Sequence, residues 1–159
     1  MGNIILPDNF HADFFQKITN TKQKVLEYRG DVFFSNKNHF KWRYLEPTQK
    51  EVCSNEEEIL IVDHDLEQVS RYLVTKGFNI GAILKKAKKY RPQIYVANFE
   101  NKKYTIKVDK REKLHSIAYF DNLDNKVQIL FTNMKYSKGN IAQKKMLCNY
   151  PKSYDIIEG

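Results

Sequence analysis

Long hydrophobic runs are missing from this sequence, which excludes one large class of proteins. No stretch approaches the roughly 18 consecutive apolar residues that a membrane-spanning helix needs, so we expect no stable membrane insertion. The opening MGNIILPDNF lacks the basic and apolar regions of a secretory signal peptide. We therefore expect either a cytosolic protein or a chain from which a signal has been removed.

Glycine, proline and cysteine are also scarce, with six, four and two among 159 residues. No Pro-rich or low-complexity linker is visible, and the length suits one core, so we predict a single domain over residues 1–159. Cys53 and Cys148 have no metal-ligand spacing. The sequence leaves open whether they form a disulfide.

Motifs that carry catalysis are lacking as well. The chain has no G-x-S-x-G, no H-E-x-x-H and no Gly-rich phosphate loop, so we expect neither an enzyme nor a cofactor. Asp63, His64 and Asp65 raise the alternative of a metal site, but carboxylates flanking one histidine in a loop are more typical of a solvated turn. We therefore expect no metal ion.

Aromatic rings and positive charge are what the sequence has in abundance. It contains ten Phe, ten Tyr and one Trp, so rings must supply much of the buried apolar surface. Lys and Arg number 27 against 19 Asp and Glu, a net charge of +8. This balance favours an anionic partner, although lysines spread along the whole chain are also what solvated strand faces would give.

The dominant hydrophobic period is two, which predicts strands. FHADFFQKI places Phe10, Ala12, Phe14, Gln16 and Ile18 on one face, and HFKWRYLEP alternates most cleanly. Similar runs continue to a last predicted strand in QKKMLCNYP, with hairpin loops at 100–102 and 121–125. We count about ten strands in meander order, which predicts one large antiparallel sheet that is curled or closed.

One segment has helical spacing instead. GFNIGAILKKAKKYRP carries an apolar stripe, with Asn79 as the candidate N-cap and Pro92 as the stop. KKAKK (85–89) is predicted to be the solvated last turn, with contact to an anionic lipid or acidic partner as the alternative. The stripe consists of Ile80, Ile83, Leu84 and Ala87.

Several predicted strands are apolar on both sides. Ile117 and Tyr119 oppose Ala118 and Phe120, for example. A curled sheet with one or two helices has too little material to cover its concave side fully, so an aromatic-lined hollow for an apolar ligand should remain.

Four motifs in order resemble the LolA family of periplasmic lipoprotein carriers. FHADFFQKI is similar to the first strand of that family, and GDVFFSNKNHFKW with YLEP to its second and third strands. DHDLEQVSRY resembles the segment before its lid helix, and MLCNYPKSYDII its last strand and tail. The resemblance covers residues 10–157.

The resemblance implies a mainly β (α+β) fold: an unclosed β-barrel of about ten or eleven strands, with one or two lid helices over an apolar cavity. It implies a monomeric periplasmic chaperone that takes acylated lipoproteins from the inner-membrane ABC transporter LolCDE to the outer-membrane receptor LolB. The lid would contain Ile80, Ile83, Leu84 and Ala87. The acyl cavity and its mouth would be lined by Phe14, Phe34, Phe40, Trp42, Tyr44, Ile61, Tyr72, Ile117, Tyr119, Ile129 and Phe131.

The chain also departs from the family pattern. Asn36-Lys37 replaces an Arg-Pro pair whose arginine is held to latch the lid, and Asn55-Glu56 replaces an Asp-Gly hairpin. Cys148 occupies a position that is often aromatic, and the first lid helix is expected to be missing or truncated.

Two other functions remain as alternatives. A basic, aromatic-rich sheet can bind single-stranded nucleic acid by stacking. However, KWRYL places its rings and its cations on opposite faces, which favours the carrier. A membrane-anchored lipoprotein receptor of the same fold is the other alternative, although no cysteine lies near the start of the chain.

Overall fold

The computed structural model describes the chain apart from residues 1–3, 5, 36–38, 55–57, 74–79 and 159. Within these described residues it contains one sheet and two helices. The helices are α1 (Ile80–Lys86) and α2 (Gln143–Met146). The strands are β1 (Asn9–Thr19), β2 (Val25–Ser35), β3 (His39–Glu46), β4 (Lys50–Ser54), β5 (Glu58–Asp63), β6 (Gln68–Leu73), β7 (Lys88–Arg91), β8 (Ile94–Phe99), β9 (Lys102–Val108), β10 (Leu114–Phe120), β11 (Lys126–Ser137) and β12 (Asp155–Glu158).

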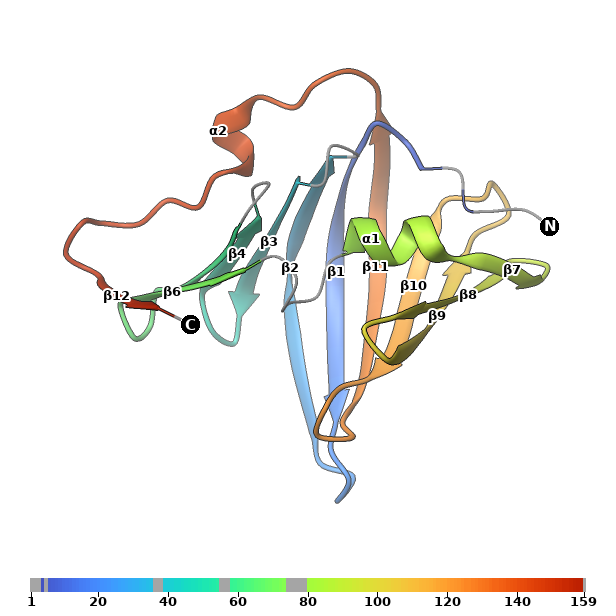
Figure 1. Cartoon of the computed structure of the whole chain (residues 1–159), viewed down its shortest axis with the longest axis horizontal. Coiled ribbons are helices and arrows are strands. Elements are labelled where there is room, and N and C mark those ends of the chain that lie inside the picture. The colour runs from blue at the N-terminus through green and yellow to red at the C-terminus, as the bar shows by residue number, and fades with distance from the viewer. Residues whose placement is uncertain (1–3, 5, 36–38, 55–57, 74–79, 159) are drawn as a thin grey trace.

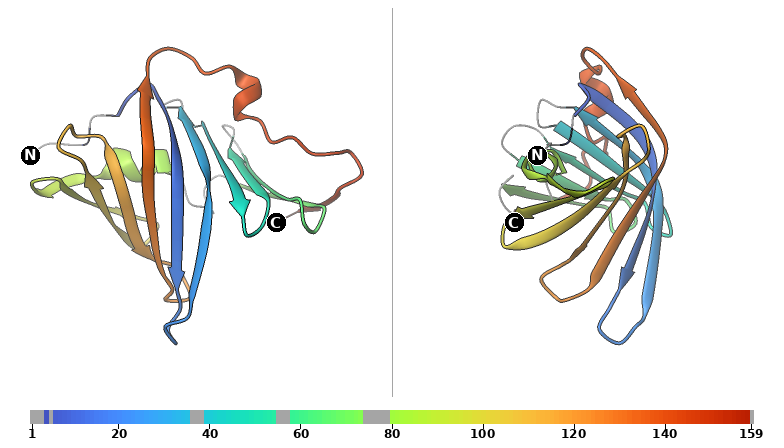
Figure 2. Two further views of the ribbon diagram at one scale, coloured as in Figure 1. Left: turned by 180° about the vertical axis from the view of Figure 1, so that it is seen from behind. Right: turned by 90° about the vertical axis from the view of Figure 1, so that its right-hand side faces the viewer.

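The strands form a single twelve-stranded sheet that curls without closing, as predicted, with slightly more strands than expected. Its order is β12-β6-β5-β4-β3-β2-β1-β11-β10-β9-β8-β7, so sequential strands pair as hairpins except where β1 joins β11 and β12 joins β6. All pairs are antiparallel apart from β12 with β6. Figures 1 and 2 show the strands bending around the side on which α1 lies.

Alternation along the central strands decides which side chains face inward. Phe10, Ala12 and Phe14 of β1 are almost completely buried, as are Phe40 and Trp42 of β3. These inward rings contact one another across strands, as in the edge-to-face pair of Phe14 and Trp42, whose centroids lie 5.1 Å apart. Such pairs add to the stabilisation that burial already provides.

Gly30 allows β2 and β3 to approach closely where the sheet bends. The register between these strands shifts at Arg29/Gly30. A Cβ atom at position 30 would collide with the backbone carbonyl oxygen of Arg43 and would lie 3.0 Å from the Phe14 ring. Only a residue without a side chain fits this bulge, which locally increases the twist of the sheet.

The two predicted hairpin loops are confirmed, each with a clear local cause. Glu100 and Asn101 join β8 to β9 with positive φ angles of 52° and 61°, the pairing of φ angles that a tight hairpin turn of type I′ requires. Between β10 and β11, the Asp121 carboxylate accepts hydrogen bonds from the backbone N–H groups of Leu123 and Asn125 at 2.9 and 3.0 Å. Short polar side chains that bond the backbone in this way favour turns.

Helix α1 is shorter than the sequence predicted. It ends at Lys86, and residues 88–91 form β7, a fully exposed strand at one edge of the sheet. The prediction that Lys88 and Lys89 belong to the last helical turn is therefore wrong. The helix buries its apolar side against the sheet, with Ile80, Ile83 and Leu84 at 1% exposure or less. This packing, rather than the length of seven residues, holds so short a helix in place.

The C-terminal part of the chain also differs from the prediction. QKKMLCNYP is not a strand, because it contains α2 followed by an irregular segment that crosses the outside of the sheet. The last strand, β12, comes later and pairs with β6 in parallel. A disulfide joins Cys148 in this segment to Cys53 of β4, which settles the pairing that the sequence left open.

The two faces of the sheet are not equally covered. The inner face carries one continuous hydrophobic cluster that runs from Phe10 on β1 to Ile117 on β10 and includes α1. On the outer face, Leu130 and Phe120 remain 38% and 58% exposed. The outer face of β10 and β11 thus keeps apolar side chains in contact with solvent, while Tyr119 and Ile129 on the inner face line a hollow.

Candidate functional site

An apolar cavity of about 270 Å³ opens on the concave face of the sheet. Strands β1, β3 to β6, β10 and β11 contribute its wall, so both halves of the chain meet there. The lining residues are Gln16, Phe40, Trp42, Tyr44, Val52, Ile59, Ile61, Tyr72, Tyr119 and Ile129.

Most of the residues expected at the cavity lie in its wall, and the others lie in the core beside it. The expected residues that line the cavity are Phe40, Trp42, Tyr44, Ile61, Tyr72, Tyr119 and Ile129. The others, Phe14, Phe34, Ile117 and Phe131, are buried in the surrounding cluster. They support the wall from behind, as the contact of Phe14 with Trp42 shows.

Three lining residues were not among those expected, namely Gln16, Val52 and Ile59. Gln16 lies on the predicted inward face of FHADFFQKI, but a polar side chain does not by itself indicate an apolar wall. Val52 and Ile59 lie on the short strands β4 and β5, where one residue of register decides the face. Their alternation with Cys53 and Leu60 was a signal, but it does not show which side faces inward.

The expected lid residues lie on or directly after α1. Ile80, Ile83 and Leu84 are in the helix, Ala87 follows it, and all four are buried in the same hydrophobic cluster as the cavity-supporting rings. The expected latch position Asn36-Lys37, the Asn55-Glu56 hairpin and the N-cap Asn79 lie outside the described residues.

Three of the residues that line the cavity are tyrosines, namely Tyr44, Tyr72 and Tyr119. Burial raises the pKa of Tyr44 to about 12, although a hydrogen bond from Gln16 acts in the opposite direction. Burial, together with nearby Tyr104 and Tyr44, also raises the pKa of Tyr119. Both phenols therefore keep their protons at neutral pH, and the wall carries hydrogen-bond donors without charge.

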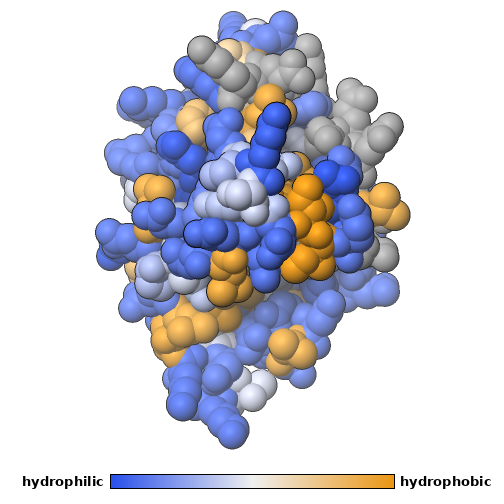
Figure 3. All heavy atoms as spheres, turned by 90° about the vertical axis from the view of Figure 1, so that its left-hand side faces the viewer, coloured by the Kyte–Doolittle hydropathy of each residue, from blue (hydrophilic) through white to orange (hydrophobic). Residues whose placement is uncertain are grey.

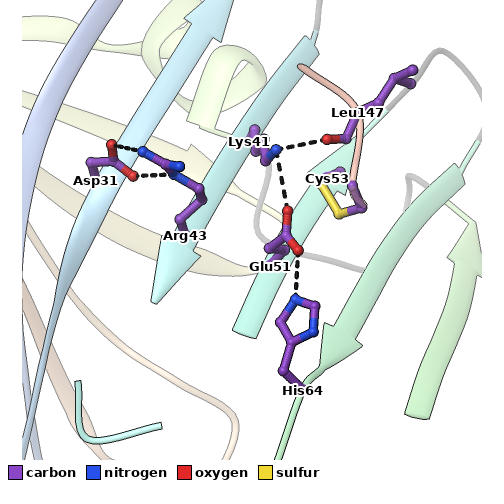
Figure 4. Close-up of polar contacts among 8 residues, drawn as sticks. Asp31, Lys41, Arg43, Glu51, Cys53, His64 and Leu147 are labelled. Carbon is purple, nitrogen blue, oxygen red and sulfur yellow. Dashed lines mark hydrogen bonds and ion pairs between the residues drawn. A yellow bond between two sulfur atoms is a disulfide. The ribbon is translucent and has the colours of Figure 1, made fainter. Parts of the chain in front are cut away.

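The outer face of β3 to β5 carries a connected polar network instead (Figure 4). Lys41 is only 5% exposed; its Nζ donates to the Leu147 carbonyl oxygen at 2.7 Å and lies 3.2 Å from Glu51 Oε1. Glu51 Oε2 lies 2.6 Å from His64 Nε2, and His64 Nδ1 lies 2.9 Å from the Tyr154 hydroxyl oxygen. Together with the disulfide, these contacts fasten the C-terminal segment to the sheet.

The arrangement does not bring Asp63, His64 and Asp65 together as ligands. His64 contacts Glu51 and Tyr154, while Asp63 accepts hydrogen bonds from the backbone N–H groups of Asp65 and Leu66. The segment is a turn, as predicted, but of these three residues only Asp65 is exposed, whereas His64 is half-buried in the polar network. Within the described residues one donor group, Glu51 with Cys53 and Cys148, is compact enough for a metal, but its two sulfur atoms are bonded to each other.

A second cluster lies on the outer face of the central strands. Arg43 binds the Asp31 carboxylate through two nitrogen atoms, with Nε donating at 2.7 Å, and His11 Nε2 lies 3.2 Å from the same carboxylate. Phe33 stacks on the His11 ring, with the Arg43 guanidinium 5.7 Å from its centroid. Phe33 and Phe34 thus point to opposite faces, as the alternation predicted.

The family model for the outer membrane lipoprotein carrier protein LolA matches residues 8–97. The chain belongs to the LolA family. Curated relatives named outer-membrane lipoprotein carrier protein include one from Campylobacter jejuni, 33% identical, over 94% of this chain and 86% of the relative. Others come from Helicobacter hepaticus, 29% identical over 94% and 83%, and Wolinella succinogenes, 28% identical over 90% and 82%.

Solved structures share the fold of this LolA-family chain. An uncharacterized conserved protein from Thermus thermophilus superposes with a TM-score of 0.59 at 12% identity, over 97% of this chain and 92% of the other. A LolA superfamily protein from Nitrosomonas europaea has a TM-score of 0.53 at 8% identity, over 91% and 92%. At such low identity, these likenesses concern the fold alone.

The surface of the LolA-family chain is mostly hydrophilic on the side of the β12 and β6 edge, with apolar patches between the charged groups (Figure 3). Ile156 and Ile157 of β12 are 53% and 44% exposed. No helix among the described residues is long and apolar enough to span a membrane.

Proposed function

We propose that this protein carries acylated lipoproteins through the periplasm, with their acyl chains held against the concave face of the sheet. The observation that carries the proposal is the apolar cavity walled by Trp42, Phe40, Ile59 and Ile61, in a chain of the LolA family. By analogy with the family, the donor is the inner-membrane transporter LolCDE and the acceptor is the outer-membrane receptor LolB. The protein acts by binding and release rather than by catalysis.

The cavity is small for the proposed cargo. Its volume of about 270 Å³ lies just below that of typical ligand pockets, which enclose about 300–1,000 Å³. A lipoprotein anchor with several acyl chains therefore needs more room than this state offers. Since α1 is buried on the same concave side, its displacement is the simplest way to enlarge the cavity.

Such an exchange also explains how a carrier can release its cargo. Each CH₂ group that leaves water contributes about 0.8 kcal/mol to binding, and a whole anchor would be held too tightly to give up. Ile83 and Leu84 of α1 are buried in the hydrophobic cluster on the concave face. The acyl chain has to compete with them for this surface, which lowers the net affinity.

The sole tryptophan gives a direct test of the carrier proposal. Trp42 lines the cavity and is 4% exposed, so a triacylated lipopeptide should change its emission on binding. Ile61→Glu places a charge in the cavity wall and should weaken binding at least about tenfold, because burying an unpaired carboxylate is costly. Titration of the full chain by fluorescence measures both effects.

Leu60→Glu is the matched control, because Leu60 is the half-buried neighbour of Ile61 on β5 and points to the other face. This variant should bind like the wild type. Equal binding by all three proteins, or no binding by the wild type, would refute the proposal. A stacking surface for nucleic acid is less well supported, since Phe40 and Trp42 are buried and face away from Lys41.

A further inference from the structure

Gln16 is the one amide in the wall of the cavity, and its position is not explained by packing. It is 8% exposed and lies among apolar or aromatic side chains. On β1 it follows the buried residues Phe10, Ala12 and Phe14 on the inward face. A buried amide costs free energy unless it is hydrogen-bonded, so an apolar residue would make the simpler wall.

Its hydrogen bond connects Gln16 to Tyr44, another lining residue. The bond joins two groups that can each donate, an amide with two N–H hydrogens and a phenol with one O–H hydrogen. It uses one of these three hydrogens, so two remain. The pair therefore retains donors beyond the bond that it makes internally.

The pair lies where the concave face changes from apolar to solvent-exposed. Gln16 is opposite Tyr28 of β2, whose ring lies 5.7 Å from that of Tyr44. Two residues further along the same face of β2, Leu26 is 59% exposed. In the other direction, Phe40 and Trp42 precede Tyr44 on β3 and are buried. The cavity is thus amphipathic, with its polar group at the solvent end.

We propose that Gln16 and Tyr44 select acyl ligands by their carbonyl group, donating hydrogen bonds to the ester or amide oxygen while the hydrocarbon lies against Phe40 and Trp42. The proposal rests on the carrier function and adds which part of the ligand the site recognises. A plain hydrocarbon chain would leave these donors without a partner, which costs affinity. The site therefore favours esters and amides of fatty acids over alkyl chains of equal length.

Two lysophospholipids that differ only at this group provide the test. Palmitoyl-lysophosphatidylcholine carries the ester carbonyl, and hexadecyl-lysophosphatidylcholine has an ether in its place. Both are titrated into the full chain below their micelle-forming concentrations, with Trp42 emission as the readout. The wild type should bind the ester roughly threefold to tenfold more tightly, the range expected for one net hydrogen bond.

The variants Gln16→Leu and Tyr44→Phe should lose this preference while keeping their affinity for the ether. Tyr44→Phe preserves the ring contacts with Phe14 and Tyr28, so it remains informative if Gln16→Leu folds poorly. The matched controls are Gln128→Leu, which lies outside the cavity wall, and Tyr90→Phe, which is 72% exposed. Both controls should keep the ester preference of the wild type.

The outcomes separate this inference from the carrier function. If the wild type binds ester and ether equally, or if Tyr44→Phe keeps the full preference, the inference is wrong although the carrier function stands. A parallel loss of both affinities in the two variants would assign the pair a structural role and also overturn the inference. If the wild type binds neither lipid, the carrier function itself fails.

Discussion

At the scale of single residues, the wall of the cavity differs from the outer face of the sheet. In the wall, polar side chains are uncharged and few, as with Gln16 and Tyr44. On the outer face, charged side chains form pairs, as with Asp31 and Arg43. An acyl chain placed in the cavity would meet no charged lining residue, which is the condition for holding it without a large desolvation cost.

Asp31 gives a prediction about pH. Burial alone would raise the pKa of Asp31, but the hydrogen bonds from Arg43 and His11 and their charges outweigh this effect and lower it. A carboxylate whose pKa is lowered by folding stabilises the protein above its ordinary pKa of about 3.9. That stabilisation is lost as the pH falls through the lowered value.

Asp31→Asn should therefore reduce the free energy of unfolding by about 1–3 kcal/mol at pH 7. The difference from the wild type should shrink below about pH 4, because the wild-type carboxylate is then being protonated. Urea denaturation of both proteins at a series of pH values measures this difference in the free energy of unfolding. If the difference in the free energy of unfolding between the two proteins is constant from about pH 7 to about pH 2, the ion pair of Asp31 does not cause it.

At the scale of elements, the C-terminal segment differs from the rest of the sheet. The central strands are held by long hairpin ladders, whereas residues 138–154 cross the outside of the sheet with little regular structure. Lys41, Glu51 and His64 hold this segment together with the disulfide. These contacts allow β12 to pair in parallel with β6.

Cys148→Ser should lower the free energy of unfolding by about 2–4 kcal/mol, the usual value for removing a disulfide, since the bridge closes a separation of 95 residues. Amide hydrogens of β12 should exchange faster, because the tether on this edge strand is lost. The wild type with a thiol reductant should behave like the variant. Unchanged stability and unchanged exchange in β12 would contradict the role given to the bridge.

At the scale of the whole molecule, α1 and the inner face of the curled sheet share one hydrophobic cluster. Strand β1 crosses the middle of the sheet and pairs along its length with β2 on one side and β11 on the other. Helix α1 has only seven residues and is held by its buried apolar side. A short helix that packs on a sheet through its side chains is easier to displace than a strand held by backbone ladders.

Loading with a triacylated lipopeptide should therefore increase hydrogen exchange in α1 and leave β1 and β11 protected. The physical reason is that the acyl chain takes the surface on which Ile83 and Leu84 rest. Hydrogen exchange of the free and loaded full chain, followed by mass spectrometry, measures it. Unchanged protection of α1 in the loaded protein would mean that the cavity enlarges elsewhere.

Much of the fold was predictable because it depends on local backbone geometry. Alternation showed the inward faces of β1 and β3, and the apolar stripe at Ile80, Ile83 and Leu84 showed the helix. The end of that helix was not predictable, since Lys88 and Lys89 suit a helical turn as well as an exposed edge strand. Pairing with β8 decided between the two.

The cavity was predictable in kind but not in detail. Tyr44, Ile61 and Tyr119 line it, whereas Phe14 and Phe131 fill the core behind it. All five lie on inward faces, and alternation cannot tell a wall from a core. The difference depends on how sharply the sheet curls and on where α1 rests.

The sequence by itself determined that this protein is a curled sheet with rings on its inner face, because side-chain direction alternates with every residue of a strand. Only the tertiary structure decided that Cys53 meets Cys148, that β12 joins β6, and that Gln16 meets Tyr44 at the solvent end of the cavity. These contacts join residues far apart in the chain. Their formation depends on register and curvature, which no local pattern encodes.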